Sequence, residues 1–236
     1  LPKYRGGAFP QVDGMSWTAE DGTHHGMLVD YLNEIAKYTG WEYEYIDTKG
    51  PAMLNEFVEG KYELMGGNYY IPALEKYYAY PNYNMGYSRS LLLARSDDRS
   101  IHSYDLESMN GKTIGVYENA RENIRRLKEF MAINGLYCNI RYYKQEDMVG
   151  KIGLYPYLAK GEIDLLLNNV AHISDSVRVV VAYDSQPYYI VTNPGNKEVL
   201  DGLNMALERI LDANPNFAAE RYAVNFPDRL VNIQLS

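Results

Sequence analysis

Polar side chains that could bind a small molecule follow two short apolar runs in distant parts of the chain. The first run leads into residues 66–69, Gly-Gly-Asn-Tyr, and the second leads into Asn168 and Asn169. Amide and phenol groups donate and accept hydrogen bonds, and tyrosine rings also offer a flat apolar face. These residue types predict non-covalent recognition of a polar molecule.

Both segments belong to a pattern that the chain repeats. Residues 57–72 read FVEGKYELMGGNYYIP, and residues 158–173 read LAKGEIDLLLNNVAHI. Each predicts a helix that stops at a glycine, an acidic residue (Glu63 or Asp164), a buried strand and a polar loop. In open α/β sheets, ligands bind at the carboxyl ends of parallel strands. The repeat therefore predicts an α/β fold with two lobes that face one cleft.

Our candidates for ligand contact lie at or beside such loops: Tyr4, Phe9, Gly67, Asn68, Tyr69, Tyr117, Asn119, Arg121, Asn168 and Asn169. Tyr69 and Tyr70 are neighbours in an extended segment, so only one can face the cleft, and we expect Tyr69. Arg121, at the start of a predicted helix, could hold an anion or be solvated. Tyr4 and Phe9 could stack on a ligand or cover the edge of the lobe.

The composition bounds the fold and the partners. The 236 residues suffice for two lobes of about 100 residues each, a usual domain size. Hydrophobic content is 46%, yet no apolar run approaches the ~20 residues that span a membrane. The net charge is -8 and the basic residues form no long cluster, which argues against a nucleic-acid partner.

Residues for covalent or metal chemistry are scarce. The single Cys138 excludes an internal disulfide, and the adjacent His24 and His25 lack the spacing that lets two side chains reach one ion. No nucleophile has a base beside it, and Glu118 is a lone acid near the predicted cleft. We therefore expect no metal, no cofactor and no catalysis. The 24 tyrosines suit cleft walls and half-wet surfaces.

Hydrophobic periodicity predicts alternating strands and helices. Residues 1–14 indicate a loop that leaves a short first strand. We expect further strands at 43–46, 90–95, 113–117, 140–143, 178–182 and 185–192. We expect helices around 28–36 with Gly40 as the C-cap, at 53–58, from about 121 to Gly135, up to Lys160, at 196–211 and at 217–222.

The order of motifs along the chain resembles the family 3 extracellular solute-binding proteins, which have the type 2 periplasmic-binding-protein fold. The family also includes sensor domains of bacterial transmembrane kinases and cyclases. The matching positions, which extend over nearly the whole chain, are Gly26, Asp30, Leu32, Ile35, Ala36, Gly40 and Trp41; Phe57, Gly60 and Glu63; Met109, Gly111, Lys112, Thr113, Gly115 and Val116; and Leu158, Gly161 and Asp164.

The resemblance implies two lobes joined by two crossing hinge strands, at about 90–95 and 188–192. Lobe 1 would comprise residues 1–90 and 190–236, and lobe 2 residues 91–189. In this family the lobes close on a small ligand, and a transporter or a signalling partner reads the closed state. It also implies an extracytoplasmic location.

Three departures from the family's amino-acid binders affect the expected ligand. The arginine that clamps the ligand's carboxylate is replaced, since the aligned residues are Ile71 and Leu74. The ammonium-binding aspartate aligns with Asn169, and a small hydroxyl residue aligns near Ala120. A free amino acid would lose its charge partners at such a site. Two readings remain: an uncharged or anionic polar ligand, or a degenerate pair of lobes that binds a partner protein or nothing.

The role of the domain has alternatives as well. The trailing residues 231–236 favour a ligand-sensing domain of a histidine kinase or diguanylate cyclase, tethered to the membrane by a segment outside this chain. The alternative is the substrate-binding protein of an ABC transporter, with a permease as its partner. A dehydratase-like enzyme on the same fold is a third possibility.

Overall fold

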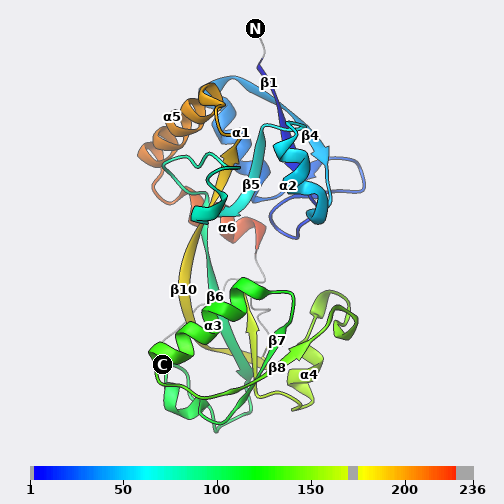
Figure 1. The fold of residues 1–236 in the computed structure, drawn as a ribbon, viewed down its shortest axis with the longest axis vertical. Coiled ribbons are helices and arrows are strands. Elements are labelled where there is room, and N and C mark those ends of the chain that lie inside the picture. Colours follow the sequence, from blue (N-terminus) through cyan, green and yellow to red (C-terminus); the bar gives the residue numbers. More distant parts are fainter. Residues whose placement is uncertain (1–2, 170–174, 227–236) are drawn as a thin grey trace. The chain divides into compact units, whose positions relative to one another are not determined.

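The computed structural model describes residues 3–169 and 175–226. Among them, residues 3–87 and 186–226 form one compact unit (unit 1), and residues 88–169 and 175–185 form a second (unit 2). In Figure 1 the colours of unit 1 come from both ends of the chain, blue to cyan and orange to red, whereas unit 2 is green to yellow. The expected lobe boundaries, near residues 90 and 190, fall within the two strands that run from one unit into the other, β6 (Gly86–Arg95) and β10 (Val177–Thr192).

The sheet of unit 1 has the strand order β4-β1-β5-β10. Strand β1 (Lys3–Phe9) runs parallel to β4 (Trp41–Asp47) and to β5 (Leu64–Tyr69), and β10 is antiparallel to β5. The remaining elements of unit 1 are the hairpin β2 (Trp17–Thr18) and β3 (His24–His25), the single turn η1 (Pro72–Leu74) and the helices α1 (Met27–Thr39), α2 (Gly50–Val58), α5 (Lys197–Ala213) and α6 (Phe217–Asn225).

Successive side chains of a strand point to opposite faces, and the core of unit 1 follows this alternation. Leu64 of β5 packs with α1 and α5, whose buried residues include Leu32 and Leu203. Its neighbour Met65 packs on the other face, in the cluster that contains Phe57 of α2. Both faces of the sheet are thus covered, as an open α/β sheet requires.

The first strand is longer than the sequence suggested. It spans seven residues, all of which pair with β4. The predicted C-cap of α1 is confirmed, since Gly40 has a left-handed φ of 70° and its amide bonds the carbonyl of Ala36. Left-handed backbone is unstrained for glycine, so this position ends the helix.

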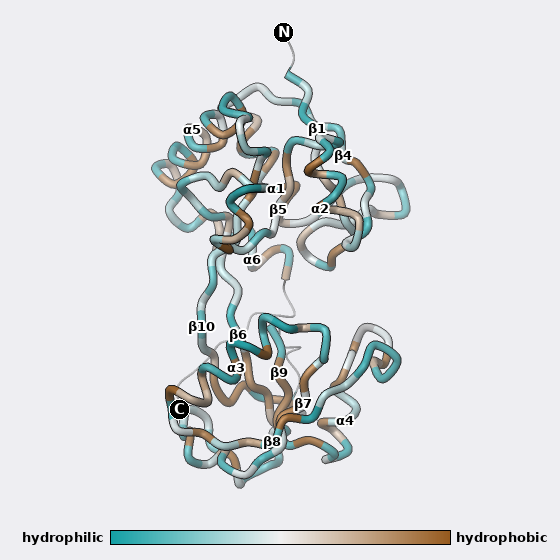
Figure 2. The backbone as a smooth tube through the Cα atoms, viewed as in Figure 1, coloured by the Kyte–Doolittle hydropathy of each residue, from teal (hydrophilic) through white to brown (hydrophobic). Residues whose placement is uncertain are grey.

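Unit 2 has the strand order β6-β9-β7-β8. Strand β7 (Thr113–Tyr117) runs parallel to β8 (Asn139–Tyr143) and to β9 (Leu165–Asn168), and β6 is antiparallel to β9. Its other elements are the helices α3 (Arg121–Ile133) and α4 (Tyr155–Ala159) and the short turns η2 (Leu106–Met109), η3 (Gln145–Asp147) and η4 (Gly150–Ile152). Figure 2 shows β9 largely in the brown of apolar residues, because this strand is buried on both faces.

The repeated sequence pattern is a repeated structure. In each copy a helix, α2 or α4, ends near a glycine with positive φ and leads into a short buried strand, β5 or β9. The acidic residue of each copy ties its strand to the neighbouring one. Glu63 pairs with Arg5 at 3.1 Å, and Asp164 accepts a hydrogen bond from the amide of Thr113 at 2.9 Å.

The sequence suggested two separate runs at 178–182 and 185–192, whereas the structure has one strand, β10, of 16 residues. The interruption is a local kink at Asp184, whose φ is 53°. The carboxylate of Asp184 lies 3.3 Å from Nε of Arg126, a buried side chain of α3.

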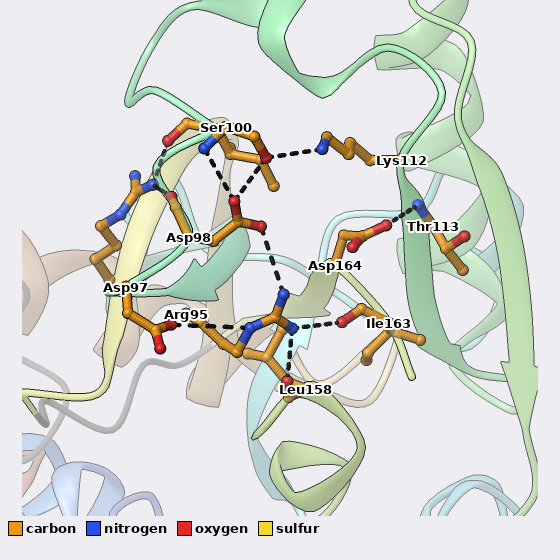
Figure 3. A network of polar contacts seen from close by, with 11 residues as sticks. Arg95, Asp97, Asp98, Ser100, Lys112, Thr113, Leu158, Ile163 and Asp164 are labelled. Atoms are coloured by element: carbon orange, nitrogen blue, oxygen red, sulfur yellow. Dashed lines mark hydrogen bonds and ion pairs between the residues drawn. The ribbon is translucent and has the colours of Figure 1, made fainter. Parts of the chain in front are cut away.

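A network of polar contacts holds the end of β6 in unit 2 (Figure 3). The guanidinium of Arg95 donates to the carbonyls of Leu158, at 2.8 Å, and Ile163, at 3.0 Å, and thus bridges α4 and β9. It also lies 3.5 Å from the carboxylate of Asp98, which accepts from Ser100.

The described part of the chain contains no helix long and apolar enough to cross a membrane.

Candidate functional site

The carboxyl ends of three parallel strands, β7, β8 and β9, form one edge of unit 2. Gly115 of β7 is paired with Leu166 of β9, and two residues further along each strand stand Tyr117 and Asn168. Because side chains alternate, both lie on the face of the sheet that Leu166 shares with α4. The fold thus brings these two predicted residues together.

The hydroxyl of Tyr117 lies at the centre of a short hydrogen-bond chain. It donates to Oε1 of Gln145 in η3, directly after β8, and accepts from Nδ2 of Asn119 at 2.9 Å. Our sequence analysis missed Gln145. The signal for it was its position just beyond the predicted strand 140–143, at the same edge as the other candidates.

Asn168, Asn169 and Arg121 complete the polar edge of unit 2. The backbone amide of Asn169 donates to Oδ1 of Asn168 at 2.9 Å, and both side chains are half-buried. Arg121 is the first residue of α3 and is exposed. Within the residues that the structure describes, its guanidinium has no hydrogen-bond or ion-pair partner. The strand ends and the helix start therefore place amides, a phenol and a guanidinium at this edge.

The corresponding edge of unit 1 is the end of β5, which carries Gly67, Asn68 and Tyr69. Asn68 donates through Nδ2 to the carbonyl of Met65 at 2.7 Å, which fixes its amide. Gly67 has a φ of 74°, a conformation that favours glycine at this bend. A Cβ there would lie 3.8 Å from the side chain of Met15.

Tyr69 and Tyr70 face opposite sides of β5, as the alternation predicts. Tyr69 packs edge-on against Tyr188 of β10, with ring centroids 6.4 Å apart. Tyr188 is buried, and this burial raises the pKa of its hydroxyl, so that it remains protonated at neutral pH. Tyr70 instead packs against Tyr80 at 5.0 Å and bonds Glu75. Tyr69 packs against the core cluster of α1, and its contact with a ligand stays a prediction.

The two candidates in the first segment lie apart from these groups. Phe9 is at the carboxyl end of β1, but its side chain is fully buried against His24 and Tyr45, so it covers the lobe and offers no surface to a ligand. Tyr4 is next to the amino end of β1, opposite the carboxyl edge, and is 67% exposed. We gave two alternatives for this segment, stacking on a ligand or covering the edge of the lobe. Phe9 fits the second.

The two adjacent histidines and the single cysteine make contacts within the fold. His24 packs on Phe9, whereas His25 stacks on Trp17 at 4.6 Å, because adjacent strand residues point to opposite faces. No group of three or more possible ligands (His, Cys, Asp, Glu) capable of holding a metal occurs among the described residues. Cys138 is half-buried, which raises the pKa of its thiol, and it contacts the carbonyl of Met109.

The chain belongs to the bacterial extracellular solute-binding proteins, family 3, whose model matches residues 6–217. Membership gives it the type 2 periplasmic-binding-protein fold, a small-solute-binding role and an extracytoplasmic location. No curated protein sequence matches the chain.

Solved structures with the same fold are similar over almost their whole length. A probable amino-acid ABC transporter extracellular-binding protein, ytmK from Bacillus subtilis, has a TM-score of 0.80 and 15% identity, with 97% of this chain and 99% of that chain covered. The second substrate-binding domain of Lactococcus lactis GlnP, in an open conformation, has a TM-score of 0.71 and 18% identity, with 93% and 95% covered.

A third similar structure connects the fold with an enzyme. The ancestral amino acid-binding protein AncCDT-1, a precursor of cyclohexadienyl dehydratase, has a TM-score of 0.66 and 18% identity, with 95% of both chains covered. At these identities the likeness establishes the fold. The family itself is mainly one of solute binders.

Proposed function

We propose that this domain is a non-catalytic binding protein for a small polar solute. The carboxyl edge of each unit carries candidate contact residues. The observation that carries the proposal is the set of polar side chains at the ends of β7, β8 and β9 in unit 2. Tyr117, Asn119 and Asn168 lie together at this edge. Such a set is suited to hydrogen bonding and stacking, not to bond cleavage.

Delivery of the solute to an ABC permease is the role that we favour. Two of the similar structures have this kind of role in their names, one as an ABC transporter extracellular-binding protein and one as a substrate-binding domain. The expectation of a sensor domain depended on residues 231–236, which lie outside the described residues. It has no support from the described structure, and transport is therefore the first role to test.

A thermal-shift screen tests solute binding directly. The purified domain is unfolded and refolded to remove any carried ligand, then screened against amino acids, nucleosides, sugars, organic anions and short peptides. A ligand at 100 times its dissociation constant adds ~2.7 kcal/mol of stability, which raises the midpoint by a few degrees. We expect one class to raise it, and Asn169→Ala and Tyr69→Ala, one from each unit, to lose that rise.

Asn139→Ala is the matched control for the screen. Asn139 carries the same amide but lies at the amino end of β8, on the opposite edge of unit 2, and is exposed. This variant should respond to the ligand as the parent protein does. If no compound of any class moves the midpoint, solute binding fails, and the degenerate reading of the lobes replaces it.

A further inference from the structure

We propose that the carboxyl edge of unit 2 selects an acceptor-rich anionic group, such as a carboxylate or a phosphate, because the amides of Gln145 and Asn168 are held with their N–H donors outward. The amide of Asn119 is held in the opposite sense, since its Nδ2 donates to Tyr117. The inference rests on the proposed solute-binding function and narrows it to a ligand class. Gln145 is the central residue, and Tyr117 is the positioning residue that fixes its orientation.

The orientation of Gln145 follows from the hydrogen-bond inventory of Tyr117. A phenol has a single proton to donate, and this proton goes to Oε1 of Gln145. The lone pairs of the same hydroxyl accept from Nδ2 of Asn119, so the phenol uses its donor and an acceptor at once. With its oxygen occupied, Gln145 presents its NH₂ group, which has no partner among the described residues.

The side-chain amide of Asn168 is also held with its N–H donors outward, by a different hydrogen bond. The backbone amide of Asn169 donates to Oδ1 of Asn168, which leaves Nδ2 of Asn168 with its two hydrogens. A backbone N–H can only donate, so the atom of the Asn168 amide that faces it must be the oxygen. Gln145 and Asn168 come from separate strand ends that both flank Tyr117, and they add their donors independently.

Charges of both signs lie at the edge. Arg121 supplies a guanidinium that is engaged by no described carboxylate, and charge-assisted hydrogen bonds are about twice as strong as neutral ones. Exposed Lys144 also lies on these loops, together with exposed Glu118 and Glu146, which oppose an anion. Neither glutamate accepts a hydrogen bond from a described residue that would hold it toward a ligand. An ammonium group, which only donates, cannot bond the outward N–H donors of Gln145 and Asn168.

The test uses ligands that share a skeleton and differ only in the end group. Glutarate, glutaramide and pentane-1,5-diamine form one series, and glycerol 3-phosphate with glycerol forms another. Thermal shift and calorimetry should show binding that favours the anion of a series by about tenfold or more, as expected for charge-assisted recognition. Binding that favours the diamine, or equal binding of amide and carboxylate, would overturn the inference and leave solute binding intact.

Variants separate orientation from charge. Gln145→Glu, which is similar in size and replaces donors by an anion, should weaken the anion about tenfold or more. Glu118→Gln on the neighbouring loop should leave or improve that affinity. Tyr117→Phe keeps the ring and frees both amides, so the preference for acceptors should fall while the thermal midpoint without ligand changes little.

A ligand-independent readout covers the case in which the probe series do not bind. In a ¹⁵N-resolved NMR spectrum of the ligand-free domain, the two side-chain NH₂ signals of Gln145 should be displaced from the positions of a solvent-exposed glutamine. Tyr117→Phe should move them to the positions of a solvent-exposed glutamine, and Asn139→Ala should not. Signals at those positions already in the parent protein would refute the locked orientation. Failure of every compound in the wider screen would refute solute binding itself.

Discussion

Gly202 lies in the middle of α5, where alanine ordinarily favours a helix by about 1 kcal/mol. Here a Cβ would lie 2.4 Å from the buried ring of Trp41. We expect Gly202→Ala to lower the free energy of unfolding by about 1–3 kcal/mol, the usual cost of overpacking. Urea titration measures it. Gly50, whose Cβ would meet nothing within 4 Å, is the control, and Gly50→Ala should be neutral or stabilising.

Residues at strand ends were easier to predict than residues inside the lobe. The positions of Tyr117 and Asn168 were predicted from the hydrophobic periodicity, because this periodicity shows where a strand ends and a loop begins. Gln145 was missed because a turn of three residues with charged neighbours reads as an ordinary connection. Phe9 was offered as a ligand contact because nothing local reveals that His24 and Tyr45, distant in sequence, bury it.

At the scale of elements, the loop after β6 makes the free energy of unfolding depend on pH. The hydrogen bond from the Ser100 hydroxyl, aided by Lys112 and Arg95, lowers the pKa of Asp98 against the opposing effect of its burial. Its contribution is therefore present above the pKa of the unfolded chain and is lost as pH falls through the lower folded pKa. We expect Asp98→Asn to cost about 1–2 kcal/mol at pH 7 and less at pH 3, in urea titrations at both.

Asp97 is the matched control for this loop. Its side chain is 90% exposed, against 12% for Asp98, and its contact with Arg95 is 3.9 Å long. Asp97→Asn should change stability by no more than about 0.5 kcal/mol. Equal effects of the two substitutions, or an Asp98→Asn effect that does not shrink in acid, would show that the network of Figure 3 does not stabilise the loop.

Two substitutions at the kink of β10 distinguish the cost of backbone strain from the contribution of the ion pair. At a φ of 53°, alanine at position 184 pays about 1–2 kcal/mol that glycine does not, whereas both lack the carboxylate that pairs with Arg126. Asp184→Ala should therefore be less stable than Asp184→Gly by about that amount. Guanidinium titrations of the two variants measure the difference. If they unfold at the same concentration, the left-handed backbone at this position carries no strain.

The elements themselves were largely predictable from the sequence, and their continuity was not. The strand 113–117 was predicted with its observed bounds, and the helix and strand of each repeated copy occur as expected. The break expected near residue 184 reflects a real kink. From the sequence alone, a polar stretch with a proline indicates a turn. The pairing of β10 with β5, which is distant in sequence, cannot be predicted from that stretch.

At the scale of the whole molecule, the two units have separate cores, which core truncations can distinguish. Leu32 of α1 and Leu127 of α3 are both fully buried, one in each unit. Each change to alanine should cost about 2–5 kcal/mol. Hydrogen exchange should then increase chiefly in the unit that carries the substitution. Uniform acceleration throughout both units in either variant would mean that they open only together.

The discontinuity of unit 1 has a consequence for the nascent chain. The described residues of unit 2 lie between 88 and 185, whereas the sheet of unit 1 needs residues 186–192 of β10, which leave the ribosome after them. Until then β5 has an open edge where β10 will pair, and unpaired strand edges invite association with other chains. The sheet of unit 1 is therefore started before that of unit 2 and completed after it.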